Sequence, residues 1–127
     1  MTDGLELLAQ GEYFGRGIIA GHNIHGDPVV GYFLTGRSEP SKARKIIETE
    51  RGLVRLEPTD PEEVKKGNPA LIIYNVLKTV GNNVVVTNGA QTDVIADYLE
   101  ANPKAGPKTA LRDVFSKPHM VGGIDLT

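Results

Sequence analysis

The 127-residue chain contains no cysteine, which excludes disulfide bonds and metal sites built on thiolates. It also lacks a long hydrophobic run, because its longest apolar segments, Ala70–Ile73 and Val84–Val86, are only the size of a strand. A membrane-spanning helix needs about 20 such residues. The first segment, Met1–Gln10, has neither the basic region nor the apolar stretch of a secretory signal. We therefore expect a cytoplasmic protein without a membrane partner.

An excess of one charge is absent as well, since 14 basic and 16 acidic residues give a formal net charge of −2. These charges are spread along the sequence, whereas binding to nucleic acid requires a clustered basic surface. We expect no nucleic-acid partner, although a local group of arginines could hold one phosphate. We also expect no metal site, because the three histidines form no ligand constellation and only Asp27 lies near His22 and His25.

Glycine and proline are frequent instead, with 15 and 8 residues, and they favour short strands and turns over a helical bundle. Tyr13–Gly21 and Pro28–Thr35 are rich in β-branched and aromatic residues, and we predict that they form a hairpin through His22–Asp27. Gly52–Pro58 is predicted to be a third strand, since its central side chains alternate between apolar and polar.

The clearest hairpin is predicted where Leu71–Val80 and Val84–Asn88 flank Gly81-Asn82-Asn83, whose residues tolerate positive φ. The segment Ser38–Ile47 is less regular. We interpret it as a loop that leads into a short helix around Ala43–Ile47.

Two helices are predicted after the second hairpin. The first spans Thr92–Ala101, and Thr92 or Asp93 is placed to cap it. Its predicted inward face consists of Val94, Ile95, Tyr98 and Leu99. The second is short, Thr109–Phe115, and we expect it to turn Leu111, Val114 and Phe115 inward.

The order hairpin, strand, hairpin, helix, helix has no long helix between parallel strands. It therefore predicts an α+β fold in which helices cover the outer face of an antiparallel sheet. The length suits a single domain over residues 1–127, with residues 1–12 as an extension and residues 116–127 as an irregular tail. Because the tail ends on Ile124 and Leu126, which could begin another strand, we expect the chain to be incomplete.

Polar residues at tight turns are the candidates for chemistry. Arg37, Ser38 and Lys42 supply a guanidinium, a hydroxyl and an ammonium group that suit a phosphate or a developing oxyanion. A solvated turn is the simpler interpretation of these three residues. It is weakened because antiparallel pairing of the first two strands would place Arg16 at the end of the hairpin where the second strand finishes, close to Arg37. Tyr74 and Asn75 interrupt an apolar strand, and because side chains alternate along a strand they face opposite ways. A buried amide or hydroxyl group needs a hydrogen-bond partner, so either residue could serve function. Tyr74 could equally be a core aromatic whose hydroxyl reaches the rim.

The segment Thr87–Asp93 places a glycine where a strand ends and a helix begins. Such a turn lets backbone approach an anion at the start of the helix. An Asn88-Gly89 turn followed by a helix cap explains the same residues more simply.

Together and in this order, these segments resemble the archaeal-type IMP cyclohydrolase family. The resemblance extends from Tyr13 to Phe115. The matching residues are Tyr13–Arg16, then Tyr32 with Arg37–Pro40, then Tyr74–Lys78 with Val80-Gly81, and last Thr87–Asp93 with Ile95–Asp97.

The resemblance implies an Ntn-hydrolase-like αββα sandwich, in which two antiparallel sheets lie between helical layers. It implies closure of the purine ring of 5-formamidoimidazole-4-carboxamide ribonucleotide to inosine monophosphate, without a metal or organic cofactor. The expected ligand is a purine nucleotide. A homo-oligomer, or association with a missing C-terminal segment, is expected as well.

The resemblance also suggests roles for individual residues. The residues expected to bind the phosphate and ribose are Arg16, Arg37, Ser38 and Asn88-Gly89, and Thr92 and Asp93 complete the binding set. Tyr74 is expected to transfer a proton. Lys42 or Arg44, together with Asn75, is expected to stabilise the oxygen that gains charge. We count Tyr74, Lys42 and Arg37 as the catalytic candidates.

The sequence departs from the family at two points. The arginine that closes the family's Arg-Ser-x-Pro-Asn-Arg turn falls on Lys42 or Arg44, and the family's acidic Asp-Tyr-Glu segment is replaced by Pro118–Gly123. Three alternatives stay open: a non-catalytic nucleotide-binding module, an Ntn amidohydrolase with Thr2 as nucleophile after loss of Met1, and a structural fragment.

Overall fold

The structure, a computed structural model, describes residues 3–11 and 15–125. Its elements in chain order are α1 (Gly4–Gln10), β1 (Arg16–His22), β2 (Pro28–Leu34), α2 (Glu39–Lys42), β3 (Arg44–Glu50), β4 (Leu53–Pro58), α3 (Pro61–Lys65), α4 (Pro69–Ile72), β5 (Asn75–Val80), β6 (Asn83–Val86), α5 (Gln91–Ala101), α6 (Pro107–Val114), β7 (Met120–Val121) and β8 (Ile124–Asp125). No helix among these described residues is long and apolar enough to cross a membrane.

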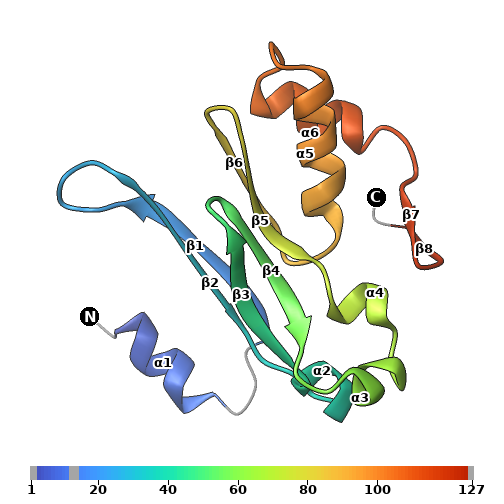
Figure 1. The fold of residues 1–127 in the computed structure, drawn as a ribbon. Coiled ribbons are helices and arrows are strands. Elements are labelled where there is room, and N and C mark those ends of the chain that lie inside the picture. The colour runs from blue at the N-terminus through green and yellow to red at the C-terminus, as the bar shows by residue number, and fades with distance from the viewer. Residues whose placement is uncertain (1–2, 12–14, 126–127) are drawn as a thin grey trace.

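Antiparallel pairing organises all the strands, which confirms the predicted α+β class. Strands β3–β4–β5–β6 form one four-stranded sheet, while β1–β2 and β7–β8 are separate two-stranded ribbons (Figure 1). The two predicted hairpins are thus present as β1–β2 and β5–β6. Tyr13, at the start of the first predicted strand, lies outside the described residues.

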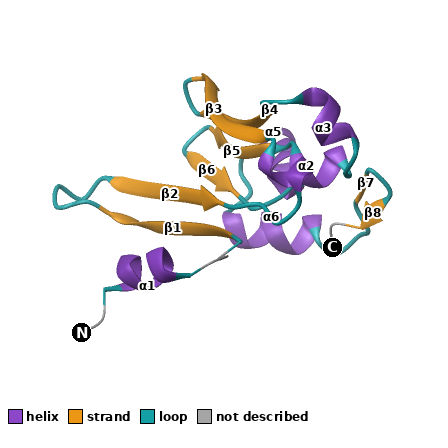
Figure 2. Cartoon of the chain, turned by 90° about the horizontal axis from the view of Figure 1, so that it is seen from below, coloured by secondary structure: helices purple, strands orange, loops and turns teal. Residues whose placement is uncertain are grey.

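The four-stranded sheet has a different partner on each face. Helices α5 and α6 pack on one face, where a buried cluster joins Val85 of β6 to Ile95 and Leu99 of α5 (Figure 1). On the other face Leu56 and Val76 pack with residues of β2 in a second cluster. The far end of the β1–β2 ribbon, with its connecting turn, projects away from the sheet (Figures 1 and 2).

The strand predicted over Leu71–Val80 is wrong at its start, because β5 begins only at Asn75. Residues Pro69–Ile72 form helix α4 instead. The side chain of Asn68 accepts a hydrogen bond from the backbone N–H of Ala70, and proline stands at the first helical position. Both features start a helix whatever the β propensity of the residues that follow.

The helix predicted around Ala43–Ile47 is also wrong. The helix lies earlier, as α2, where Ser38 and Ser41 form a capping box. Strand β3 follows directly from Arg44, and Ile46 pairs with Leu56 of β4. A cross-strand partner that lies ten residues later in the chain decides the conformation of this segment, and the local sequence does not reveal it.

Helices α5 and α6 lie where they were predicted, but some details differ. Ala90, not Thr92 or Asp93, is the N-cap of α5 and makes no side-chain cap. In α6 Val114 is buried as expected, whereas Leu111 and Phe115 are 47% and 38% exposed and the small Ala110 faces the core in their place. The tail predicted to be irregular contains the small ribbon β7–β8, and the extension at residues 1–12 contains α1.

Tyr98 of α5 and Asp113 of α6 join the two helices. The Tyr98 hydroxyl donates to Asp113 Oδ2 at 2.7 Å, and Arg112 Nε donates to Asp113 Oδ1 at 2.8 Å. These two hydrogen bonds, that of Tyr98 first, lower the pKa of the Asp113 carboxyl group below its ordinary value. A depressed folded-state pKa stabilises the fold above the unfolded-state pKa, and this contribution is lost as the pH falls through the folded-state pKa.

We therefore expect Tyr98→Phe to lower the thermal midpoint at neutral pH and to have a smaller effect in acid, where Asp113 is protonated in both states. Melting curves of the variant and the unmodified chain, followed by circular dichroism across the acid range, measure this difference. A difference in midpoint that stays constant with pH would show that the Tyr98–Asp113 bond does not depend on the charge of the carboxylate.

Candidate functional site

Three arginines from separate segments converge on one pocket of about 310 Å³. Arg16 comes from the start of β1, Arg37 from the turn after β2 and Arg44 from the start of β3. The lining residues are Arg16, Thr35, Gly36, Arg37, Ser38, Ser41, Arg44, Gly67, Asn68, Leu71 and Ile72. None of them is acidic, so the described wall of the pocket favours an anion.

The β1–β2 register brings the first two arginines together. Arg16 pairs with Leu34, and the backbone N–H of Thr35 donates to the carbonyl of Gly15 at 2.7 Å. The chain then turns sharply at Gly36, where an added Cβ would lie 2.6 Å from Ser41 Oγ. Because only glycine fits there, the turn that carries Arg37 folds back tightly against α2.

Arg44 forms part of the pocket wall and also adds its charge to it. Its Nη1 donates to the carbonyl of Ile72 at 2.9 Å, and its Nη2 donates to the carbonyl of Thr35 at 3.4 Å. The guanidinium therefore connects the end of α4 to the end of β2. The planar fork of an arginine directs donors from separate nitrogens of one rigid group, whereas the three donors of a lysine ammonium all leave a single nitrogen.

Lys42 lies outside this pocket, contrary to the expectation that it contributes to the site. Its ammonium group forms an ion pair with Glu39 Oε1 at 2.9 Å, and its side chain is 53% exposed. Of the two positions considered for the family's closing arginine, the structure places Arg44 at the pocket. Lys42 is the last residue of α2 (Glu39–Lys42), whereas Arg44 is the first residue of β3, with Ala43 between them.

A pair of tyrosines adjoins the pocket through Arg16. Tyr74 is only 6% exposed, and its hydroxyl oxygen lies 2.8 Å from that of Tyr32. Arg16 Nη1 donates to the same Tyr74 oxygen at 3.1 Å, and the Arg16 guanidinium carbon lies 5.8 Å from the centre of the Tyr74 ring. The ring and the hydroxyl of Tyr74 thus both hold the guanidinium that lines the pocket.

Tyr32 was not among the candidate site residues, although a tyrosine at this position belongs to the family pattern. Burial, followed by its hydrogen bond to Tyr74, raises the pKa of Tyr32 well above the ordinary value. Strand alternation could have identified it. Tyr32 lies two residues before Leu34, the partner of Arg16, and therefore shares the Arg16 face of the ribbon.

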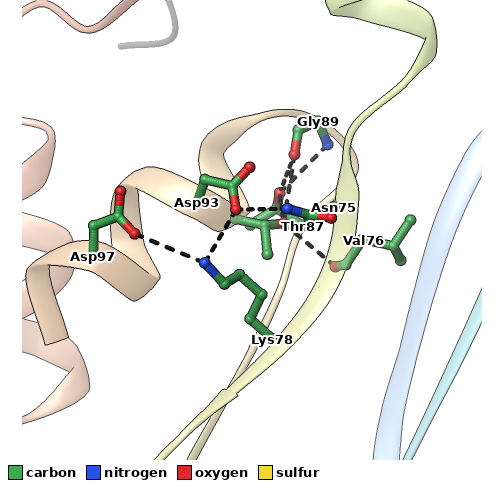
Figure 3. A network of polar contacts seen from close by, with 8 residues as sticks. Asn75, Val76, Lys78, Thr87, Gly89, Asp93 and Asp97 are labelled. Atoms are coloured by element: carbon green, nitrogen blue, oxygen red, sulfur yellow. Dashed lines mark hydrogen bonds and ion pairs between the residues drawn. The ribbon is translucent and has the colours of Figure 1, made fainter. Parts of the chain in front are cut away.

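Asn75 and Asp93 belong to a second polar network that does not line the pocket (Figure 3). Asn75 Nδ2 donates to Asp93 Oδ1 at 2.8 Å. Lys78 forms ion pairs with the same oxygen at 3.3 Å and with Asp97 at 3.7 Å. These contacts hold strand β5 against helix α5, and they engage the Asn75 amide that was expected to face the substrate.

The remaining predicted ligands, Asn88, Gly89 and Thr92, also lie outside the pocket lining. Thr92 is fully buried, and its hydroxyl is bonded to Thr87 Oγ1 at 2.7 Å and to the carbonyl of Val76 at 3.3 Å. The hydroxyl of Thr92 is thus engaged within the fold. The turn that carries these residues closes onto β5, and Thr87 also donates to the carbonyl of Gly89 at 2.8 Å (Figure 3).

An α+β chain with three arginines around one pocket and a buried tyrosine beside it has the features of a protein that binds a small anionic ligand. Comparison with known proteins identifies the group: residues 13–115 match the family described as IMP cyclohydrolase-like protein, and the chain belongs to this family.

The similar proteins are archaeal and carry the name IMP cyclohydrolase. The protein from Methanococcus maripaludis strain S2 is 41% identical over 88 residues, which are 69% of this chain and 42% of that protein. The protein from Methanopyrus kandleri is 36% identical over 102 residues, 80% of this chain and 48% of that protein. The protein from Halobacterium salinarum is 35% identical over 118 residues, which are 87% of this chain and 56% of that protein. The chain thus spans about half the length of these relatives.

Proposed function

We propose that this chain provides the nucleotide-binding part of an IMP cyclohydrolase, which closes the purine ring of 5-formamidoimidazole-4-carboxamide ribonucleotide. The observation that carries the proposal is the convergence of Arg16, Arg37 and Arg44 on one pocket next to Tyr74. The family membership and the names of the relatives supply the reaction.

We assign the 5′-phosphate of the nucleotide to the three arginines. A phosphate accepts charge-assisted hydrogen bonds from guanidinium groups, and a pocket lined by several of them neutralises its charge. Ser38, which also lines the pocket, would add a hydroxyl donor. Holding the phosphate end fixed lets the enzyme freeze the rotamer in which the two reacting groups of the base meet.

The reaction forms one C–N bond and releases one water molecule. The carboxamide nitrogen attacks the formyl carbon and gives up one proton, and the formamide nitrogen gives up a second proton when the C=N bond forms. The formyl oxygen receives both protons and leaves as water. We assign the transfer of the first of these protons to Tyr74, because its hydroxyl accepts a hydrogen bond from Arg16, which lines the pocket.

We further infer an Ntn-hydrolase-like αββα architecture for the full-length members. The arrangement found here supports it, since helices cover one face of the sheet and the β1–β2 ribbon lies on the other. In such a sandwich the ribbon would belong to the second sheet. An experimental structure of a full-length relative tests this inference, and a second sheet that excludes the ribbon would contradict it.

Adding the formamido ribonucleotide to the purified chain and following ultraviolet absorbance tests the activity. Calorimetry with inosine monophosphate tests binding separately. A second candidate, a nucleotide-binding module without turnover, is favoured by the absence of an acidic residue in Pro118–Gly123. Binding without ring closure would select this candidate, and the absence of both would reject the proposed function.

Removing one pocket arginine should weaken the affinity for inosine monophosphate. A charge-assisted hydrogen bond contributes about 1.5–3 kcal/mol, so Arg37→Ala should raise the Kd roughly 10- to 100-fold. Calorimetry measures this change. Arg51→Ala is the matched control, because Arg51 is an exposed arginine in the turn between β3 and β4 and does not line the pocket. Equal losses in both variants would show that affinity depends on overall charge and not on the pocket.

A further inference from the structure

We propose that Tyr32 is a positioning residue for ring closure, which acts by donating a hydrogen bond from its hydroxyl group to the hydroxyl oxygen of Tyr74. The inference rests on the proposed function, because it concerns the tyrosine to which we assign proton transfer. It adds a residue that is not among those lining the pocket and was not a candidate from the sequence.

The oxygen of Tyr74 has two protein neighbours within hydrogen-bonding distance. Tyr32 Oη lies at 2.8 Å and Arg16 Nη1 at 3.1 Å. A guanidinium can only donate, so Tyr74 must accept from Arg16. A phenolic oxygen accepts up to two hydrogen bonds and donates one. If Tyr32 is also a donor, both acceptor positions are filled and the Tyr74 proton is left for the substrate.

The environment of Tyr32 is compatible with this direction of the bond. Burial and the bond to Tyr74 raise the pKa of Tyr32, while the charges of Arg16 and Arg44 act in the opposite sense and are outweighed. Tyr32 therefore keeps its proton at neutral pH and is available as the donor. The reverse direction would use the Tyr74 proton in the bond to Tyr32 and leave none for the reaction.

The fold keeps both donors on one rigid surface. Arg16 and Tyr32 lie on neighbouring strands, where Arg16 pairs with Leu34 and Ile18 pairs with Tyr32. Both side chains therefore face the four-stranded sheet, and Tyr32 packs against the buried cluster that contains Tyr74. The β1–β2 ribbon thus presents two hydrogen-bond donors to a single oxygen.

This arrangement explains how Tyr74 could give up and regain a proton. When the formyl oxygen takes the proton from Tyr74, the phenolate that remains is stabilised by the hydrogen bonds from Tyr32 and Arg16. It then takes up the proton that the carboxamide nitrogen releases, which restores the starting state. Two donors that are already in place require no reorganisation during the reaction.

Kinetics of Tyr32→Phe test the catalytic part of the inference. Loss of one hydrogen bond should lower kcat about tenfold and change its pH profile, while KM and the affinity for inosine monophosphate stay close to their original values. Tyr98→Phe is the matched control, because it removes a hydroxyl bonded to Asp113 on the α5–α6 side and should leave kcat unchanged. An unchanged kcat and pH profile in Tyr32→Phe would overturn the inference.

Carbon NMR of protein labelled at the ζ carbon of tyrosine provides a readout that does not depend on activity. The Tyr74 resonance should shift in Tyr32→Phe and stay in place in Tyr98→Phe. No shift in Tyr32→Phe would overturn the inference even if the enzyme is active. A shift in a chain that binds inosine monophosphate without ring closure would overturn the proposed reaction, and Tyr32 would then only support the fold.

Discussion

Tyr74→Phe is expected to lower the rate of ring closure by about 10²–10⁴-fold, the usual effect of losing a general acid or base. The affinity for inosine monophosphate should change little, because Tyr74 does not line the arginine pocket. The phenyl ring is retained, so the contact between the ring and the Arg16 guanidinium persists. The expected effect is therefore on kcat and not on binding.

The same substitution also removes the partner of two hydrogen bonds. Tyr32 and Arg16 would both lose the oxygen to which they are bonded, which costs about 1–3 kcal/mol where the groups stay out of contact with water. The fraction of folded Tyr74→Phe must therefore be measured by circular dichroism before its rate is compared. A folded variant that keeps the rate of the unmodified chain would remove Tyr74 from the mechanism.

The hairpins were predictable because their signals are local. Gly81 adopts φ = 58° between β5 and β6, and the β-branched runs on either side favour strands. Strand β3 was not predictable in the same way. The turn between β3 and β4 does contain a glycine, Gly52 with φ = 83°, but Arg44–Glu50 does not alternate between apolar and polar residues and becomes a strand because β4 pairs with it.

The arginine pocket was only partly predictable from the sequence. Hairpin pairing implied that Arg16 and Arg37 lie at one end of the ribbon, and the structure places both at the pocket. The choice between Lys42 and Arg44 depended on where α2 ends and β3 begins, which the capping pair Ser38 and Ser41 at the start of α2 does not determine. Lys42 ends α2 and Arg44 begins β3, so these two side chains have different surroundings although they are only two positions apart.

The tyrosine pair and the Asn75–Asp93 network depend on tertiary packing and could not be found from spacing. Tyr32 and Tyr74 are 42 residues apart and meet only because the ribbon packs on the sheet. Thr92 fits a helix cap in the sequence, yet the approach of α5 to β5 turns its hydroxyl to the carbonyl of Val76. A local motif can indicate that a polar residue needs a partner, and the fold decides which partner it has.

The β1–β2 ribbon and the sheet should be strongly coupled through Leu56. This side chain is fully buried, and its backbone N–H donates to the carbonyl of Tyr74 at 2.9 Å. It packs in the cluster that contains Tyr74, Val76 and the tyrosine and leucine of β2. Loss of its packing would therefore loosen the contact that brings Arg16 to Tyr74.

Leu56→Ala should lower the free energy of unfolding by about 2–5 kcal/mol, because a large-to-small change in a core removes apolar contacts and leaves a cavity. Against a typical total of about 5–15 kcal/mol, this is a large fraction of the stability. Urea unfolding followed by circular dichroism measures it. Leu111→Ala is the matched control, since this leucine is 47% exposed and should change the stability by about 0.5 kcal/mol or less. Equal losses in the two variants would show that the core between the ribbon and the sheet is not where the structure places it.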